Sequence, residues 1–161
     1  MSQRGGSRRQ ARVYALQALY QQDVNQTASQ VALNSLWEVL VDGEGVDGER
    51  APESDEVEFA QRIVRGVEQK QAEIDALIEA SSTNWRLRRM PAVDRNILRI
   101  AAYELMSCED IPATVSVNEA VELAKLFGSD DSRAFVNGIV DRIGRQVGRL
   151  PEGGARRRRD A

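Results

Sequence analysis

The chain has 161 residues, of which 42% are hydrophobic and 29% charged, a size and composition typical of one soluble globular domain. Its net charge is −3, and it contains no histidine and a single cysteine, Cys108, which excludes histidine-dependent catalysis, His/Cys zinc sites and a disulfide framework. No apolar run approaches the roughly 20 residues of a membrane span, and we expect a cytoplasmic protein without a signal peptide.

Apolar residues recur at helical spacing along the chain, and strand signals are weak. The segment Ser7–Gln10 has the pattern of a capping box, in which the serine hydroxyl and the glutamine side chain each pair with a backbone N–H, so we expect the first helix to begin there. A second capping box, Thr27–Gln30, predicts the start of the next helix. The inward stripe of that helix is Leu33, Leu36, Trp37 and Leu40.

An acidic loop follows the second helix. Residues 42–54 contain three glycines and one proline, and residues 42–58 carry eight acids against one arginine. This charge cannot cradle phosphate, and the spacing of the acids does not match a calcium-binding loop. We therefore expect a mobile acidic loop over 42–54, outside any nucleic-acid site.

The central part of the chain predicts three further helix boundaries. Ser54 is expected to cap a third helix, and the polar stretch Glu68–Gln71 favours a break before a fourth helix over one long helix. Pro91 suits the first turn of a fifth helix, because its missing N–H would be unpaired there. The connector Trp85–Arg89 places an aromatic residue among three arginines; it could bind RNA, but a packed Trp85 and Leu87 with solvated arginines is the favoured interpretation.

A third capping box, Ser116–Glu119, predicts the start of the sixth helix, and Gly128 predicts its end. Asp130 or Asp131 is expected to cap a seventh helix. Residues 145–161 are rich in arginine and glycine and are expected to be a disordered tail. The sequence thus predicts an all-α protein: a flexible basic segment over 1–6 and a single globular domain of about seven helices over 7–144. The centre of its C-terminal part should contain Ile97, Ala101, Val121, Phe127 and Ile139.

Charge is unevenly distributed along the chain. Residues 1–12 hold four arginines and no acid, residues 145–161 hold six arginines and two acids, and residues 13–144 hold 12 basic against 23 acidic residues. Basic arms on an acidic body suggest an anionic partner such as nucleic acid, although two solvated tails are equally consistent with the pattern.

Few residues are candidates for chemistry. The chain has neither a GxGxxG nor a GxxxxGK[ST] motif, and acids beside Cys108 disfavour a reactive thiolate, so we expect no catalytic residue, metal site or cofactor. Arg8, Arg9 and Arg12 lie in the first turns of a helix, where the helix dipole opposes positive charge, so capping does not explain them whereas an anionic partner would. Phe135 has the spacing of a core residue but lies near a helix start, where phosphate can bind.

Three stretches of the chain together resemble a known family. They are RRQARVYALQALYQ (8–21), NWRLRRMPAVDRNILRIAAYELM (84–106) and DIPATVSVNEAVELAKLFGSDDSRAFVNGIVDRI (110–143). In order and spacing they resemble the NusB family of bacterial transcription antitermination factors. The resemblance covers about residues 8 to 143.

The resemblance implies a helical fold of two packed subdomains and a non-catalytic function. It implies a complex with NusE, a small-subunit ribosomal protein, that binds single-stranded boxA RNA of nascent transcripts, chiefly from ribosomal RNA operons. This assembly would join RNA polymerase and other Nus factors and suppress termination. The RNA-binding positions implied by the family are Arg8, Arg9, Arg12 and Phe135. The partner-binding positions implied are Tyr20, Asp94 and Asp131.

Several alternatives remain open. The chain could be a protein–protein adaptor that does not itself bind RNA, which its acidic body would fit, or a NusB-like domain that serves an RNA methyltransferase. It could form a homodimer. The Arg156–Arg159 run could add phosphate contacts. We also expect that reversing the charge of Asp94 would weaken NusE binding and leave the fold intact, as for a charge at the rim of an interface.

Overall fold

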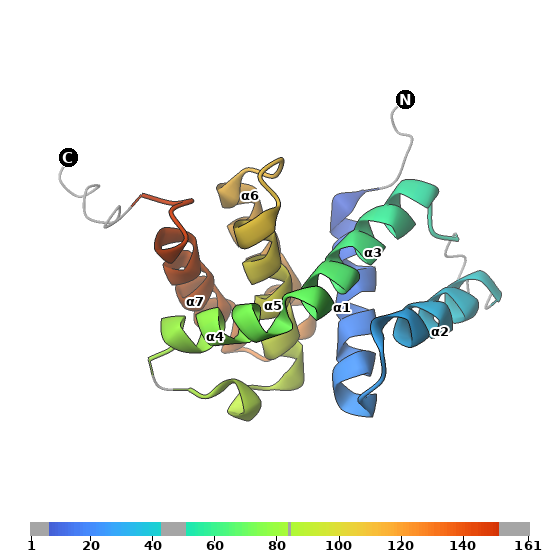
Figure 1. Ribbon diagram of the computed structural model, residues 1–161, viewed down its shortest axis with the longest axis horizontal. Helices are drawn as coiled ribbons and strands as arrows, with labels where there is room; N and C mark the ends of the chain where they lie inside the picture. Colours follow the sequence, from blue (N-terminus) through green and yellow to red (C-terminus); the bar gives the residue numbers. More distant parts are fainter. Residues whose placement is uncertain (1–6, 43–50, 84, 152–161) are drawn as a thin grey trace. The chain divides into compact units, whose positions relative to one another are not determined.

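The computed structural model describes residues 7–42, 51–83 and 85–151 (Figure 1). These residues form seven α-helices and one 3₁₀ turn and contain no strand, which confirms the all-α prediction. The chain divides into two compact units, Met1–Gln69 and Lys70–Ala161.

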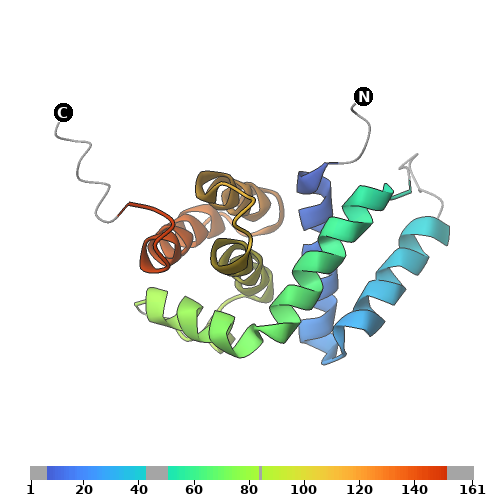
Figure 2. The same ribbon diagram turned by 45° about the horizontal axis from the view of Figure 1, so that its top comes forward.

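The first unit consists of α1 (Arg8–Asn25), α2 (Ser29–Asp42) and α3 (Ser54–Gln69). Helix α3 packs along α1, and α2 packs mainly against α1, so the three helices lie side by side (Figure 2). The alanines of α1 permit this close packing because they are small and fully buried. The buried apolar side chains of this unit include Tyr14, Leu16, Leu19, Leu33, Phe59 and Ile63.

Helix α1 begins where the sequence predicts and has the predicted serine cap. Helix α2 also begins where expected, but its cap is not the predicted threonine. Ser7 caps α1, since its Oγ accepts the Gln10 N–H at 2.9 Å. Helix α2 begins two residues after Thr27, but Thr27 Oγ1 is buried without a hydrogen-bond partner. The α2 cap comes from α3 instead: the Glu68 carboxylate accepts the Ser29 N–H at 3.0 Å and the Ser29 hydroxyl at 2.5 Å.

The second unit consists of α4 (Gln71–Ser81), the 3₁₀ turn η2 (Leu87–Arg89), α5 (Ala92–Ser107), α6 (Ala113–Phe127) and α7 (Ser132–Gln146). The break expected between the third and fourth helices is confirmed. Helices α5, α6 and α7 pack against one another, and α4 packs across α5 and α7. The side chains at the centre of this packing include Ile74, Ile78, Ile97, Leu98, Leu105, Leu123 and Ile143.

Two details of the second unit differ from the prediction. Phe127, expected in the core, is the last residue of α6 and is 43% exposed, while Val121 is only half-buried. Helix α6 begins at Ala113, directly after Pro112 and three residues before the expected cap Ser116. The Ser116 N–H already donates to the Pro112 carbonyl within the helix, and its hydroxyl donates to buried Glu104 at 2.6 Å. Ile97, Ala101 and Ile139 are buried as expected, and α6 ends before Gly128 as expected.

The C-terminal boundary also lies further along the chain than expected. Helix α7 continues to Gln146, and beyond it Arg149 donates hydrogen bonds to the carbonyls of Leu105 at 3.0 Å and Ile111 at 2.6 Å. Order therefore extends past the expected boundary at 144 to residue 151. The flexible segment expected over 1–6, most of the acidic loop expected over 42–54 and the Arg156–Arg159 run lie outside the described residues.

Candidate nucleic-acid and partner interface

The start of α1 places its arginines around an aromatic ring of α3. The guanidinium carbons of Arg8, Arg12 and Arg62 lie 4.3, 5.3 and 5.9 Å from the centre of the Phe59 ring. Such cation–π contacts are each worth on the order of 0.5–2 kcal/mol. They account for the positions of Arg8 and Arg12 at a helix start that repels positive charge, without an RNA partner.

The three predicted RNA-binding arginines of α1 are not equally accessible. Arg8 and Arg9 are exposed, whereas Arg12 is only 2% exposed. A side chain this buried cannot reach a phosphate at the surface without leaving its place against Phe59. Direct contact with RNA is therefore available to Arg8 and Arg9, and Arg12 holds the helix start in place.

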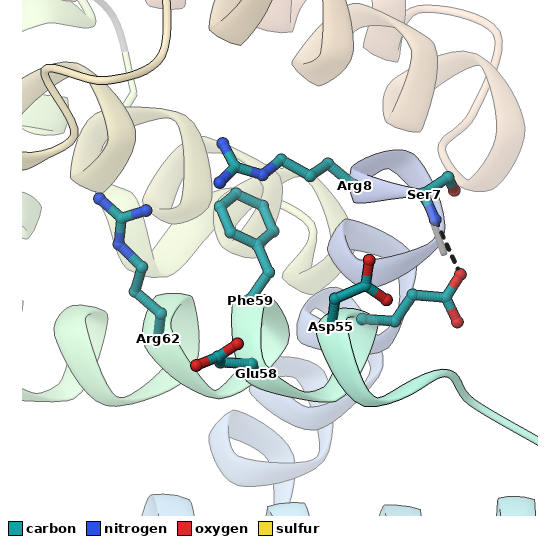
Figure 3. Close-up of a pocket in the computed structure, with 7 residues that line it drawn as sticks. Ser7, Arg8, Asp55, Glu58, Phe59 and Arg62 are labelled. Carbon is teal, nitrogen blue, oxygen red and sulfur yellow. Dashed lines mark hydrogen bonds between the residues drawn. The ribbon is translucent and has the colours of Figure 1, made fainter. Parts of the chain in front are cut away.

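A surface hollow of about 450 Å³ opens beside this ring. Figure 3 shows the Arg8 side chain over the Phe59 ring and the Arg62 side chain next to it, with Asp55 and Glu58 on α3. At one end of the hollow the Ser7 N–H donates to the buried Glu56 carboxylate at 2.9 Å (Figure 3). Because cationic and anionic groups line it together, the hollow offers phosphate contacts only at its arginine edge.

The second unit presents a different kind of surface, built on two aromatic rings. Phe135, in the first turn of α7, is half-buried, and its ring meets the Trp85 ring edge to face, with centroids 5.9 Å apart and planes at 74°. Trp85 is 47% exposed, so the expectation that it would be packed away is wrong. Leu87 is buried and the neighbouring arginines are exposed, as expected.

Asp94 lies at the start of α5 and is not a surface charge. It is 4% exposed, and its Oδ1 accepts the hydroxyl of Ser132, the first residue of α7, at 2.7 Å. Burial raises the pKa of the Asp94 carboxyl above its ordinary value, and the hydrogen bond from Ser132 opposes this rise only in part. The rim position expected for Asp94 is therefore wrong, and we now expect charge reversal here to disturb the fold, because a lysine would bury an amine where two helices begin.

The loop before α7 is organised by the same serine. Ser132 Oγ accepts the Ser129 N–H at 2.9 Å, and a Cβ added at Gly128 would collide with this Oγ. Only glycine leaves room at position 128 for the loop to approach the helix start. Asp131 precedes α7 and is exposed, but its side chain makes no capping hydrogen bond, contrary to the expected role for Asp130 or Asp131.

The described residues offer no group of three or more metal-ligating side chains, and none of their helices has both the length and the hydropathy to cross a membrane. Tyr20, the remaining partner-binding position implied by resemblance, is 43% exposed on α1.

Comparison with known proteins is decisive about the family. Residues 9–145 match the model of the NusB family. The chain belongs to the NusB family. A NusB transcription antitermination protein of Myxococcus xanthus is 48% identical over 138 residues, covering 86% of this chain and 94% of that protein, and its Trichlorobacter lovleyi counterpart is 49% identical over 139 residues, covering 86% and 90%.

Solved NusB structures have the same fold. T. maritima NusB matches with a TM-score of 0.76 at 34% identity, covering 88% of this chain and 93% of that one. A structure of the antitermination factors NusB and NusE in complex with double-stranded RNA matches with a TM-score of 0.71, covering 86% and 96%; at 24% identity it shows a shared fold alone.

The NusB positions implied by resemblance fall into both units. Arg8, Arg9, Arg12 and Tyr20 lie on α1, whereas Asp94, Asp131 and Phe135 lie around the starts of α5 and α7. Within the second unit, Ser132 links Asp94 to the segment that carries Asp131 and Phe135. Trp85 is a candidate site residue that the sequence prediction missed, because it was expected to be packed. An aromatic side chain among arginines was the sequence feature that could have identified it.

Proposed function

We propose that this NusB family member is a cytoplasmic, non-catalytic transcription antitermination factor that binds single-stranded boxA RNA together with NusE. Its targets would be nascent transcripts, chiefly of ribosomal RNA operons, and it would join RNA polymerase and other Nus factors. The observation that carries the proposal is the family match over residues 9–145, with relatives of nearly the same length that are named transcription antitermination proteins.

The geometry supports distinct roles for the site residues. In this proposal, exposed Arg8 and Arg9 contact phosphates, and the half-buried Phe135 ring stacks on a base. Exposed Tyr20 and Asp131 are the partner contacts. Arg12 and Asp94 support these surfaces from within, Arg12 through Phe59 and Asp94 through Ser132.

The test is binding of a fluorescently labelled boxA RNA, measured by anisotropy at several salt concentrations with and without NusE. Each phosphate contact to single-stranded RNA contributes about −0.7 to the slope of log affinity against log salt. Replacing Arg8 or Arg9 by alanine should therefore flatten the slope by about 0.7 each. Arg65→Ala, an exposed arginine of α3 that donates to Gln30, is the matched control and should leave the slope unchanged.

Variants of Arg12 and Phe135 distinguish a residue that supports the fold from one that contacts RNA. Arg12→Ala should lower the melting temperature, because it removes a buried cation–π partner of Phe59. Phe135→Ala should weaken RNA binding by about 1–3 kcal/mol with the salt slope unchanged, since a stacked base carries no phosphate contact. A slope that stays the same in the Arg8/Arg9 double alanine variant would show that RNA is held elsewhere.

A protein–protein adaptor without RNA binding of its own is the second candidate. It is favoured by the contacts to Phe59, which explain Arg8 and Arg12 without RNA. If boxA RNA binds only after NusE is added, and alanine at Arg8 and Arg9 leaves that binding unchanged, the chain acts as an adaptor. Sedimentation of the free chain would show whether it also forms a homodimer.

A further inference from the structure

The pairing of Trp85 with Phe135 in the second unit is not explained by packing alone. An indole that is about half exposed leaves apolar surface in water, and a large exposed aromatic side chain beside another often marks a binding site. The ring edge of one residue against the face of the other keeps both in a defined orientation. A surface of this kind is suited to an occupant with a flat aromatic face.

The segment that carries Trp85 is anchored at its next residues. The Leu87 N–H donates to Glu79 at 2.8 Å, and Arg95 donates to the carbonyls of Leu87 at 3.3 Å and Met90 at 3.0 Å. The Leu87 and Met90 side chains are buried. The exposed indole therefore lies two residues before a 3₁₀ turn that is held in place, which lowers the entropy cost of ordering the indole on binding.

Helix α7 is tied to the same region from the other side. Arg142 donates to the Ser81 carbonyl at 2.6 Å, and the Ser81 hydroxyl donates to Gln146 at 3.3 Å. These bonds hold the end of α4 against α7, so the chain that leaves α4 runs beside the helix that carries Phe135. The segment that carries Trp85 and the helix that carries Phe135 are thus both anchored to α4.

The charges that accompany the rings are basic. Arg86, Arg88 and Arg89 are exposed on the segment that carries Trp85, and Arg133 is exposed two residues before Phe135. Aromatic faces combined with exposed cations are the arrangement by which proteins hold single-stranded nucleic acid: bases stack on the rings and phosphates approach the cations. Arginine side chains can also stack on bases themselves.

We propose that Trp85 and Phe135 form a two-ring platform that stacks unpaired bases of single-stranded RNA, with the phosphates held by Arg88 and Arg89. This proposal rests on the proposed RNA-binding function and adds to it a stacking residue, Trp85, and two phosphate contacts from the second unit. The platform reads no base edge, so it contributes affinity with little sequence preference.

The test uses the full chain bound to NusE and a labelled single-stranded boxA RNA. In a Trp37→Phe background, Trp85 is the one tryptophan of the chain, so its fluorescence reports on the platform alone. Adding RNA should quench this fluorescence in step with the anisotropy rise. Trp85→Ala should weaken binding by about fivefold to a hundredfold, the loss expected for one stacked base, with the salt slope unchanged. Trp85→Phe should retain most of the affinity because it keeps an aromatic face.

Controls separate the platform from general effects. Phe127→Ala removes an exposed aromatic side chain of α6 that is not part of the platform, and it should leave the affinity for RNA unchanged. Replacing Arg88 and Arg89 by alanine should flatten the salt slope by about 0.7 each. Melting curves of all variants establish that the fold is kept, and Trp85→Phe keeps the test valid if Trp85→Ala unfolds.

The outcomes distinguish two failures. If RNA raises the anisotropy while Trp85 fluorescence and the affinity of Trp85→Phe and Trp85→Ala stay at the parent values, the platform is overturned and the RNA-binding function stands. If no RNA binds to the parent chain with or without NusE, the proposed function fails and the platform fails with it.

Discussion

Two carboxylates bind a serine at the start of a helix, one in each unit, and their settings are opposite. In the first unit, exposed Glu68 accepts both the N–H and the hydroxyl of Ser29. In the second unit, buried Asp94 accepts the hydroxyl of Ser132. The hydrogen bonds from Ser29 lower the pKa of Glu68, whereas burial raises the pKa of Asp94.

The comparison shows that the ionisation of a carboxyl group paired with a serine can be favoured or opposed, depending on its exposure to water. At Glu68 water solvates the charge, so the hydrogen bonds decide the direction of the pKa shift. At Asp94 the loss of water outweighs one hydroxyl donor. Ionised Glu68 therefore caps α2 and stabilises the fold. Asp94 is a buried link between α5 and α7, and its ionisation lowers the stability of the folded chain.

The largest effect should come from reversing the buried charge. Asp94→Lys should destabilise the chain by about 3–5 kcal/mol, because it leaves a buried ion without a partner of opposite charge. Urea unfolding measures this loss. Asp131→Lys, an exposed neighbour of the same loop, should change stability by no more than about 0.5 kcal/mol. Equal stability of the two variants would refute the buried setting of Asp94.

Removing the serine from the buried pair should have the next largest effect. Ser132→Ala should cost about 1–3 kcal/mol, because the buried Asp94 carboxylate and the Ser129 N–H both lose their partner. Ser129→Ala is the control, since it removes an exposed hydroxyl that lies 3.3 Å from Ser132 Oγ but leaves the bonds of Ser132 to Asp94 and to the Ser129 N–H in place. Thermal unfolding of both variants would measure the difference, and equal losses would count against the Ser132 link.

The exposed pair should contribute less. Glu68→Gln should cost about 0.5–2 kcal/mol at neutral pH, the range for loss of a helix N-cap, because the amide is a weaker acceptor for Ser29. Glu73→Gln, an exposed acid of α4, is the matched control and should have almost no effect. Circular dichroism during urea unfolding is the measurement.

The smallest effect, and the sharpest contrast, is in the pH dependence. Because the pKa of folded Glu68 is lowered, its stabilisation is present above the ordinary value of 4.5 and is lost as the pH falls through the lowered value. Because the pKa of folded Asp94 is raised, its stabilisation is present below the ordinary value of 3.8 and is lost as the pH rises through the raised value.

As the pH falls, the stability advantage of the parent over Glu68→Gln should therefore shrink. Over the same range, the stability of the parent should rise relative to that of Asp94→Asn. Unfolding measured as a function of pH in the acid range tests both differences. Shifts of the same sign in the two variants would show that the buried and exposed pairs do not differ as described.

The helices could be predicted from the sequence because their causes are local. Ser7 caps α1 through its own next residues, and the apolar spacing that places Ile97 and Ile139 inside is a property of single helices. Where the cause is distant, prediction fails. The cap of Ser29 comes from Glu68, and the partner of Ser116 is Glu104; neither pairing is visible in a window of a few residues.

The candidate site was predictable in its exposed parts. Arg8, Arg9, Tyr20 and Asp131 are at the surface, consistent with the positions implied by family resemblance. Apolar periodicity does not predict the burial of a charged residue, so Arg12 and Asp94 were expected at the surface. Instead Arg12 packs against Phe59 and Asp94 accepts a hydrogen bond from Ser132. The sequence also cannot show that Trp85 meets Phe135, because the two residues approach only after α4 and α7 have packed.

The segment after α7 has a consequence for proteolysis. Trypsin cleaves after arginine only where the chain can leave its neighbours and enter the protease, and Arg149 is held by its side chain on two carbonyls and by its N–H on Gly144 at 2.8 Å. Cleavage of the bond between Arg149 and Leu150 therefore requires this segment to detach first. The rate of that cut measures how often the end of the second unit opens while the rest of the unit stays folded.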